Sequence, residues 1–137
     1  MHKLEIPACI DRLDEVLEFV GAAMCEAGID GKHNNNINIA VEEVFVNIAH
    51  YAYPSGEGDV LMSLSVSPEN FLMEFRDNGT PYDPLSRDDP DTTLSAEERE
   101  IGGLGIFMVK QLMDSVSYRY EDGSNVLTIT KTLGSRD

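Results

Sequence analysis

The stretch that decides the fold is residues 37–81, INIAVEEVFVNIAHYAYPSGEGDVLMSLSVSPENFLMEFRDNGTP. Its first part repeats apolar residues at helical spacing, whereas the part after Gly58 alternates apolar and polar residues. A period near 3.6 indicates a helix, and a period of two indicates a half-buried strand. The sequence therefore predicts a helix over about Asn35–Tyr51, followed by an antiparallel hairpin whose turn is Pro68-Glu69-Asn70.

The segments before this stretch predict a strand and a helix. His2–Pro7 alternates enough to form a short edge strand. A helix is expected from Leu13 to near Gly28, with Asp11 as its N-cap. Gly31–Asn36 is polar and is expected to break the chain before the next helix.

The segments after it predict one more helix and one more hairpin. Leu104–Asp114 is strongly apolar and is expected to be helical. Val116–Tyr120 and Val126–Leu133 alternate and are expected to pair, with Asp122-Gly123 in the turn. The whole order predicts an α+β fold in which about three helices cover one face of a mixed, mainly antiparallel sheet. Residues 1–137 are expected to form this two-layer sandwich as a single domain.

The composition of the chain limits the partners and the location that are expected for it. The chain has 137 residues, is 42% hydrophobic and carries a net charge of −15. So acidic a protein is not expected to bind nucleic acid directly, and a basic protein partner suits it better. No apolar run is long enough for a membrane span and no signal peptide is recognisable, so we expect a cytoplasmic protein. Cys9 and Cys25 lack metal-ligand spacing and are expected to be reduced, packed thiols.

Glu43 and Asn47 form the first candidate site. At about 100° per residue they stack at one edge of the helix core stripe, while Glu42 points away and is expected to face solvent. The Asn47 oxygen is a suitable Mg²⁺ ligand, and the Glu43 carboxylate can accept a proton from an attacking hydroxyl. A solvated helix flank is the plainer interpretation of the pair taken alone.

The second candidate is the turn of Asp77, Gly79 and Pro81, where the hairpin ends. The Asp77 carboxylate can accept a hydrogen bond from the exocyclic amine of adenine, whereas guanine presents a carbonyl there. Gly79 allows a close approach of the backbone to the base, and Pro81 stiffens the exit. An ordinary Asx turn is the alternative.

The third candidate is the glycine run of Gly102, Gly103 and Gly105 at the start of a predicted helix. Glycine N–H groups and a helix N-terminus suit phosphate oxygens. A flexible hinge is the plainer interpretation of the glycine run taken alone. Residues 82–101 are expected to form a lid over the nucleotide. Since Lys and Arg number only ten, Mg²⁺ and backbone N–H groups are expected to carry most of the phosphate charge. Sequence spacing does not choose among Arg87, Arg99 and Lys110 as phosphate contacts.

Together the three motifs resemble the N, G1 and G2 boxes of the GHKL ATPase superfamily, and are most similar to those of the bacterial anti-sigma-factor serine/threonine kinases. The resemblance rests on Glu43-x-x-x-Asn47, Asp77-x-Gly79-x-Pro81 and Gly103-x-Gly105, and runs from about Leu4 to Leu133. It implies a Bergerat-type sandwich that binds Mg-ATP, with Glu43 as catalytic base and Asn47 as metal ligand. The nucleotide contacts that it implies are Asn47, Asp77, Gly79, Pro81, Gly102, Gly103, Leu104, Gly105 and Ile106.

The resemblance also implies a reaction and partners. The expected reaction is phosphorylation of a serine or threonine on an anti-anti-sigma protein of the STAS type, with a sigma factor as competing partner. Members of this family commonly dimerise. Two other functions stay open: an ATP-gated binding module without catalysis, and the catalytic half of a histidine kinase whose phosphoacceptor histidine lies elsewhere.

Overall fold

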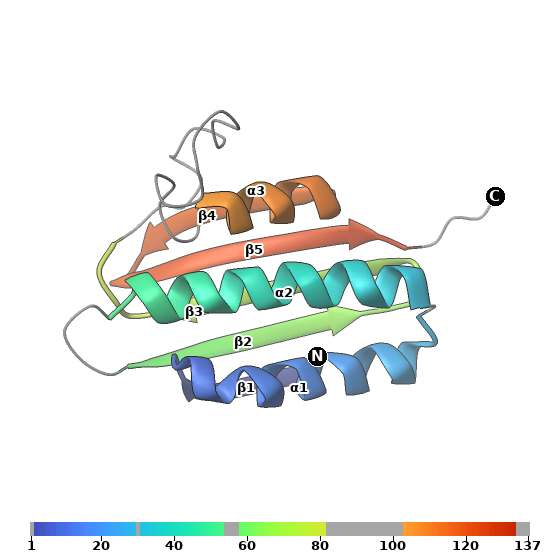
Figure 1. Ribbon diagram of the computed structural model, residues 1–137, viewed down its shortest axis with the longest axis horizontal. Helices are drawn as coiled ribbons and strands as arrows, with labels where there is room; N and C mark the ends of the chain where they lie inside the picture. Colours follow the sequence, from blue (N-terminus) through green and yellow to red (C-terminus); the bar gives the residue numbers. More distant parts are fainter. Residues whose placement is uncertain (1, 30, 54–57, 82–102, 134–137) are drawn as a thin grey trace.

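A computed structural model describes residues 2–29, 31–53, 58–81 and 103–133. The expected lid at residues 82–101, with Arg87 and Arg99, lies outside the described residues, and so does Gly102. Within the described ranges the predicted order of elements is confirmed. The chain forms a sheet with three α-helices on one of its faces (Figure 1).

The sheet contains five strands in the order β1-β2-β3-β5-β4. Every pairing among these described strands is antiparallel, so the parallel component expected of a mixed sheet is not found there. Both predicted hairpins, β2–β3 and β4–β5, are confirmed. The strands are β1 (His2–Pro7), β2 (Asp59–Val66), β3 (Asn70–Asp77), β4 (Ser115–Glu121) and β5 (Ser124–Thr132).

The register places the apolar residues of neighbouring strands opposite one another. Met62 of β2 pairs with Phe75 of β3, and Phe75 pairs with Leu127 of β5. Since side chains alternate between the two faces of a strand, this register gathers the apolar set on one face. The helices have to cover this face to remove its apolar side chains from water.

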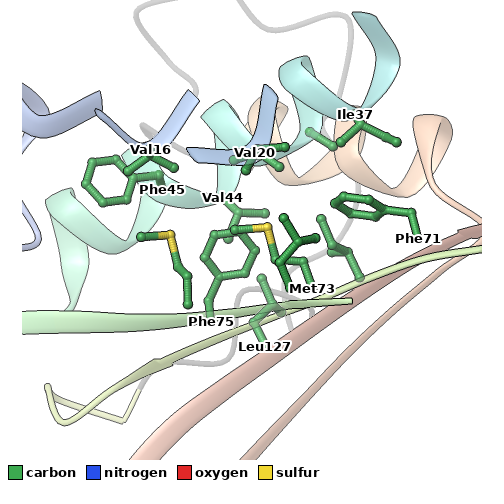
Figure 2. Close-up of a cluster of buried hydrophobic side chains, with 14 of the residues drawn as sticks. Val16, Val20, Ile37, Val44, Phe45, Phe71, Met73, Phe75 and Leu127 are labelled. Atoms are coloured by element: carbon green, nitrogen blue, oxygen red, sulfur yellow. The ribbon is translucent and has the colours of Figure 1, made fainter. Parts of the chain in front are cut away.

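The cover consists of α1 (Leu13–Ala27), α2 (Gly31–Tyr51) and α3 (Gly103–Leu112). The central helix is α2, which packs against α1 and α3 (Figure 1). Figure 2 shows the resulting core, where Phe45 of α2 and Val16 of α1 lie above Phe75 of β3. All three side chains are at most 1% exposed, so the core fills the whole space between the two layers.

The predicted N-cap of α1 and the predicted start of α2 are wrong. Asp11 lies inside a short 3-10 turn, Ile10–Arg12, and α1 begins after Arg12 without a side-chain cap. The polar Gly31–Asn36 segment is the first part of α2 rather than a break. Asparagine is a poor helix former, but burial of the apolar stripe of α2 stabilises the helix and lets it extend through these residues.

The turn between β4 and β5 is the predicted one. Asp122 and Gly123 have φ angles of 54° and 77°. Positive φ at both central residues matches the tight hairpin turn that Asp-Gly favours. The turn leads into β5, whose start pairs with the end of β3, where Asn125 lies opposite Asp77.

Two further expectations concern chemistry outside the core. Cys9 and Cys25 are free thiols, but both are exposed rather than packed as we expected. Among the described residues, none of the helices combines the length and apolar character that a membrane span requires.

Candidate functional site

The three predicted motifs come from elements that meet at one end of the sandwich. The C-terminal half of α2, the end of β3, the start of β5 and the start of α3 all lie at the left of Figure 1. A hydrogen bond of 2.7 Å from the Thr80 N–H to the Ala52 carbonyl joins the turn after β3 to the end of α2. The structure therefore brings Asn47 and Asp77 to the same end of the fold.

Asn47 is a buried polar residue on α2, with 4% of its surface exposed. Its Oδ1 atom has no hydrogen-bond partner among the described residues. A buried acceptor without a protein partner costs free energy unless a water or a ligand satisfies it. The plainer interpretation of this side chain, a solvated helix flank, is wrong.

Glu43 lies one turn before Asn47 and is half-buried. Burial raises the pKa of the Glu43 carboxyl, and the charge of Glu42 raises it further. Glu42 is itself half-buried rather than exposed to solvent as expected. The raised pKa of Glu43 lies closer to neutral pH than that of an exposed glutamate. The Glu43 carboxylate is therefore the stronger proton acceptor of the two.

The amide oxygen of Asn47 is chemically suited to a magnesium ion. An amide oxygen is a hard donor, and Mg²⁺ keeps several waters and phosphate oxygens in place of a full protein cage. No cluster of three or more His, Cys, Asp or Glu side chains suited to a metal occurs in the part of the chain that the structure describes. The Asn47 Oδ1 atom is one such hard donor.

Asp77 is the buried carboxylate of the site, with 4% of its surface exposed. Its Oδ1 accepts hydrogen bonds of 2.9 Å from the Gly79 N–H and from Asn125 Nδ2. Burial raises the pKa of Asp77, while these two hydrogen bonds lower it, and burial is the larger effect. A base amine that donated to this carboxylate would favour its charged form.

Gly79 is required by a contact that the sequence did not indicate. A Cβ atom at this position would lie 2.0 Å from the Ala52 carbonyl oxygen. The close approach is therefore to the end of α2, whereas we had expected an approach to the base. Pro81 follows in an exposed segment, and the structure does not test its expected role.

Sequence reasoning missed three side chains that hold the Asp77 turn. Tyr53 accepts a 2.9 Å hydrogen bond from the Asn78 N–H and donates one of 2.7 Å to the Asp59 carbonyl. Asn125 bonds Asp77, and Tyr118 bonds Asn125. One signal was present: Asn125 is a polar residue on the face of β5 that also carries Leu127 and Ile129.

The glycine run is described only in part. Gly103 begins α3, as predicted for a run that opens a helix, and Leu104, Gly105 and Ile106 lie in its first turns. The N-terminus of α3 lies at the same end of the fold as Asp77 (Figure 1). Backbone N–H groups at a helix N-terminus suit an anion. Lys110, farther along α3, is exposed.

Comparison with known proteins gives one family for nearly the whole chain. Residues 6–131 match the family described as the histidine kinase-like ATPase domain. Over 115 residues the chain is 30% identical to a serine-protein kinase RsbW of Listeria monocytogenes, covering 80% of this chain and 73% of that protein. It is 27% identical over 95 residues to the serine/threonine-protein kinase BtrW of Bordetella bronchiseptica, covering 69% and 67% of the two chains.

Solved structures agree on the fold. The crystal structure of the RsbU and RsbW domains of Rv1364c from Mycobacterium tuberculosis has a TM-score of 0.67 at 17% identity. The match covers 99% of this chain but 34% of that longer one. The mycobacterial sensor histidine kinase MprB has a TM-score of 0.54 at 17% identity over 94% of this chain and 97% of its own.

The Gly79 contact leads to a stability prediction. Gly79→Ala should lower the free energy of unfolding by about 1–3 kcal/mol, because the new methyl group overlaps the Ala52 backbone. Gly21→Ala in α1 is the matched control, since nothing lies within 4 Å of a Cβ there, and it should stabilise the protein by roughly 0.5–1 kcal/mol. Urea unfolding of both variants measures the difference. Equal stabilisation by the two substitutions would contradict the contact.

The raised pKa of Asp77 leads to a pH prediction. Because the folded-state pKa lies above the unfolded one, ionised Asp77 costs stability at neutral pH, and this cost disappears as the pH falls below the unfolded value. Asp77→Asn should therefore make the nucleotide-free protein more stable than wild type at neutral pH. The difference should shrink as the pH falls toward about 3.9, the ordinary value for aspartate.

Urea unfolding at several pH values measures this effect. The exposed Asp59→Asn is the control and should behave like wild type throughout. If Asp77→Asn were less stable than wild type at neutral pH, its two hydrogen bonds would outweigh the burial cost, contrary to our assignment.

Proposed function

Since the chain belongs to the histidine kinase-like ATPase family, we propose that it is an ATP-dependent serine/threonine protein kinase that also acts as an anti-sigma factor. The observation that carries the proposal is the buried Asn47 Oδ1, which has no hydrogen-bond partner among the described residues and lies one turn from Glu43. A proton acceptor at i and a metal ligand at i+4 on one helix supply two of the groups that phosphoryl transfer uses.

Asp77 supports the choice of adenine as the base. Both hydrogen bonds that it receives from described residues go to Oδ1. Oδ2 can then accept a hydrogen bond from a ligand amine. Adenine offers that amine, and guanine offers a carbonyl oxygen that a carboxylate would repel. We propose that Gly79 and Pro81 complete this side of the pocket.

We propose that the phosphates bind at the start of α3. We propose that Gly102, Gly103, Leu104, Gly105 and Ile106 contact them through the backbone, and that residues 82–101 act as the lid. Mg-ATP supplies the γ-phosphoryl group. Asn47 Oδ1 would hold the metal, and the half-buried Glu43 would take the proton of the acceptor hydroxyl.

The partner part of the proposal rests on the resemblance of the motifs and on charge. The proposed phosphoacceptor is a serine or threonine of an anti-anti-sigma protein of the STAS type, and the sequestered partner is a sigma factor. A chain of net charge −15 favours partners with a basic contact surface. Such partners are cytoplasmic, so the proposal places this chain there too, and the active form is proposed to be a homodimer.

A phosphotransfer assay tests the proposal. Wild type, incubated with Mg²⁺, labelled ATP and a candidate anti-anti-sigma protein, should transfer label to that protein. Glu43→Gln should slow transfer by about 10²–10⁴-fold, as expected for loss of a general base. Glu42→Gln is the matched control, because it removes the adjacent carboxylate, and it should retain most of the rate.

Two results would contradict the assignment. ATP binding by wild type without any transfer would indicate a nucleotide-gated binding module, the alternative function. Equal transfer rates in Glu43→Gln and Glu42→Gln would remove Glu43 from the chemical step.

Base recognition has its own prediction. Asp77→Asn should weaken ATP binding by about 1–3 kcal/mol, the range for a hydrogen bond to a charged group. Calorimetry with a non-hydrolysable ATP analogue and Mg²⁺ measures the effect, with Asp59→Asn as the control. Unchanged affinity in Asp77→Asn would show that Asp77 lies outside the nucleotide pocket.

A further inference from the structure

A chain of hydrogen bonds runs from β4 through β5 to the end of β3. The Tyr118 hydroxyl donates to Asn125 Oδ1. Asn125 Nδ2 donates to Asp77 Oδ1 at 2.9 Å and to the Thr80 carbonyl at 2.9 Å. Asn125 is 6% exposed, so these contacts lie inside the protein. A single amide therefore joins the first and last residues of the Asp77–Thr80 turn.

The surroundings of the Asn125 amide allow one orientation. If the amide were flipped, Oδ1 would face the Asp77 carboxylate and the Thr80 carbonyl, and three acceptors would meet without a proton between them. With Nδ2 toward Asp77 and Thr80, Oδ1 is left facing β4. The Tyr118 hydroxyl satisfies that oxygen, and a buried acceptor left without such a donor would cost free energy.

The rest of the turn is held by independent bonds. Thr80 N–H bonds the Ala52 carbonyl, and Asn78 N–H bonds the Tyr53 hydroxyl. Ser124 Oγ donates to Asn78 Oδ1 at 2.6 Å. The backbone of the turn therefore has supports of its own. Asn125 is the side chain that fixes the Asp77 carboxylate itself.

We propose that Asn125 and Tyr118 are positioning residues for base recognition. They hold the Asp77 carboxylate in an orientation in which Oδ1 accepts hydrogen bonds from the protein and Oδ2 faces the amine of the base. This inference rests on the proposed function, because it deepens the role given there to Asp77. Neither residue needs to contact the nucleotide, so their effect on binding passes through the Asp77 carboxylate.

The described groups that donate hydrogen bonds to the Asp77 carboxylate are neutral, whereas the charged side chains nearby make other contacts. The phenol of Tyr53 comes from the segment after α2, and the phenol of Tyr118 comes from β4. Arg76 and Glu74 also lie on β3 but pair with each other and with other residues on the opposite face of the sheet. Gly79 and Asn125 supply the two hydrogen bonds that favour the charged form of Asp77.

The first test removes one hydroxyl. Tyr118→Phe keeps the ring but takes the donor from Asn125 Oδ1, so affinity for a non-hydrolysable ATP analogue with Mg²⁺ should fall about two- to tenfold. Tyr120→Phe is the matched control, since it removes a phenol from the same strand at a side chain that is 47% exposed. Its affinity should equal that of wild type. Thermal unfolding of both variants establishes that each is folded.

The second test uses pH to separate positioning from packing. In Asn125→Asp, the introduced carboxyl can donate to Asp77 Oδ1 while the pair of carboxyls holds a proton, and repels Asp77 when both are ionised. The affinity relative to wild type should therefore fall as the pH rises and the pair loses its shared proton. A residue needed only for packing would give a loss that does not change with pH.

The outcomes distinguish failure of the proposed function from failure of this further inference. No binding of the ATP analogue by wild type would overturn both the proposed function and this inference. Binding by wild type, with Tyr118→Phe equal to Tyr120→Phe and a loss in Asn125→Asp that does not change with pH, would overturn the inference alone. A selective loss in Tyr118→Phe with the expected pH trend in Asn125→Asp would establish both residues as positioning residues.

Discussion

The site depends on one contact between the two layers, at the carbonyl of Ala52. This carbonyl ends α2 and accepts the Thr80 N–H, and a Cβ on Gly79 would lie 2.0 Å from its oxygen. At this point the helix layer and the sheet layer therefore meet backbone to backbone. This approach brings the last two turns of α2, which include Asn47, to the end of β3, where Asp77 lies.

Buried polar groups lie at the same end of the fold, and the protein satisfies their hydrogen-bonding capacity only in part. Asn47 and Asp77 are each 4% exposed. Asn47 Oδ1 has no hydrogen-bond partner among the described residues, and burial keeps the pKa of Asp77 above its ordinary value. Both features cost stability in the free protein, and a ligand with a metal and a donor amine would relieve both. Sites of this kind sacrifice stability for binding.

The sequence was sufficient for features that depend on local pattern. Alternation predicted the hairpins, helical spacing predicted α2, and the order of polar motifs predicted that Asn47 and Asp77 would come together at one end of the fold. It failed at the start of α2, where the packing of Ile37 and the residues after it overrides the low propensity of the asparagines before it.

The sequence also failed where contacts join distant segments. Asn125 lies 48 residues from Asp77, and its role depends on the register of β3 with β5. The reason for Gly79 likewise depends on the position of Ala52 in another layer. Local patterns report which face of an element is buried, and they carry no information on which partner lies against it.

The alternation of β3 has a further consequence for the chemistry of Asp77. Arg76 is its neighbour in sequence, yet the Arg76 guanidinium lies on the opposite face, 3.3 Å from a carboxylate oxygen of Glu121. On that face Arg76 and Arg119 lie opposite Val126 in the strand register, and Val126 is fully buried.

Because the adjacent cation is held on that face, the carboxylate of Asp77 receives hydrogen bonds from neutral donors, the Gly79 N–H and the Asn125 amide. An arginine at that carboxylate would form an ion pair with it and occupy the oxygen that a ligand needs. A carboxylate held by neutral donors keeps one oxygen for a neutral amine. In the proposed mode of base recognition, the position of Arg76 on the other face therefore leaves that carboxylate oxygen available to a ligand.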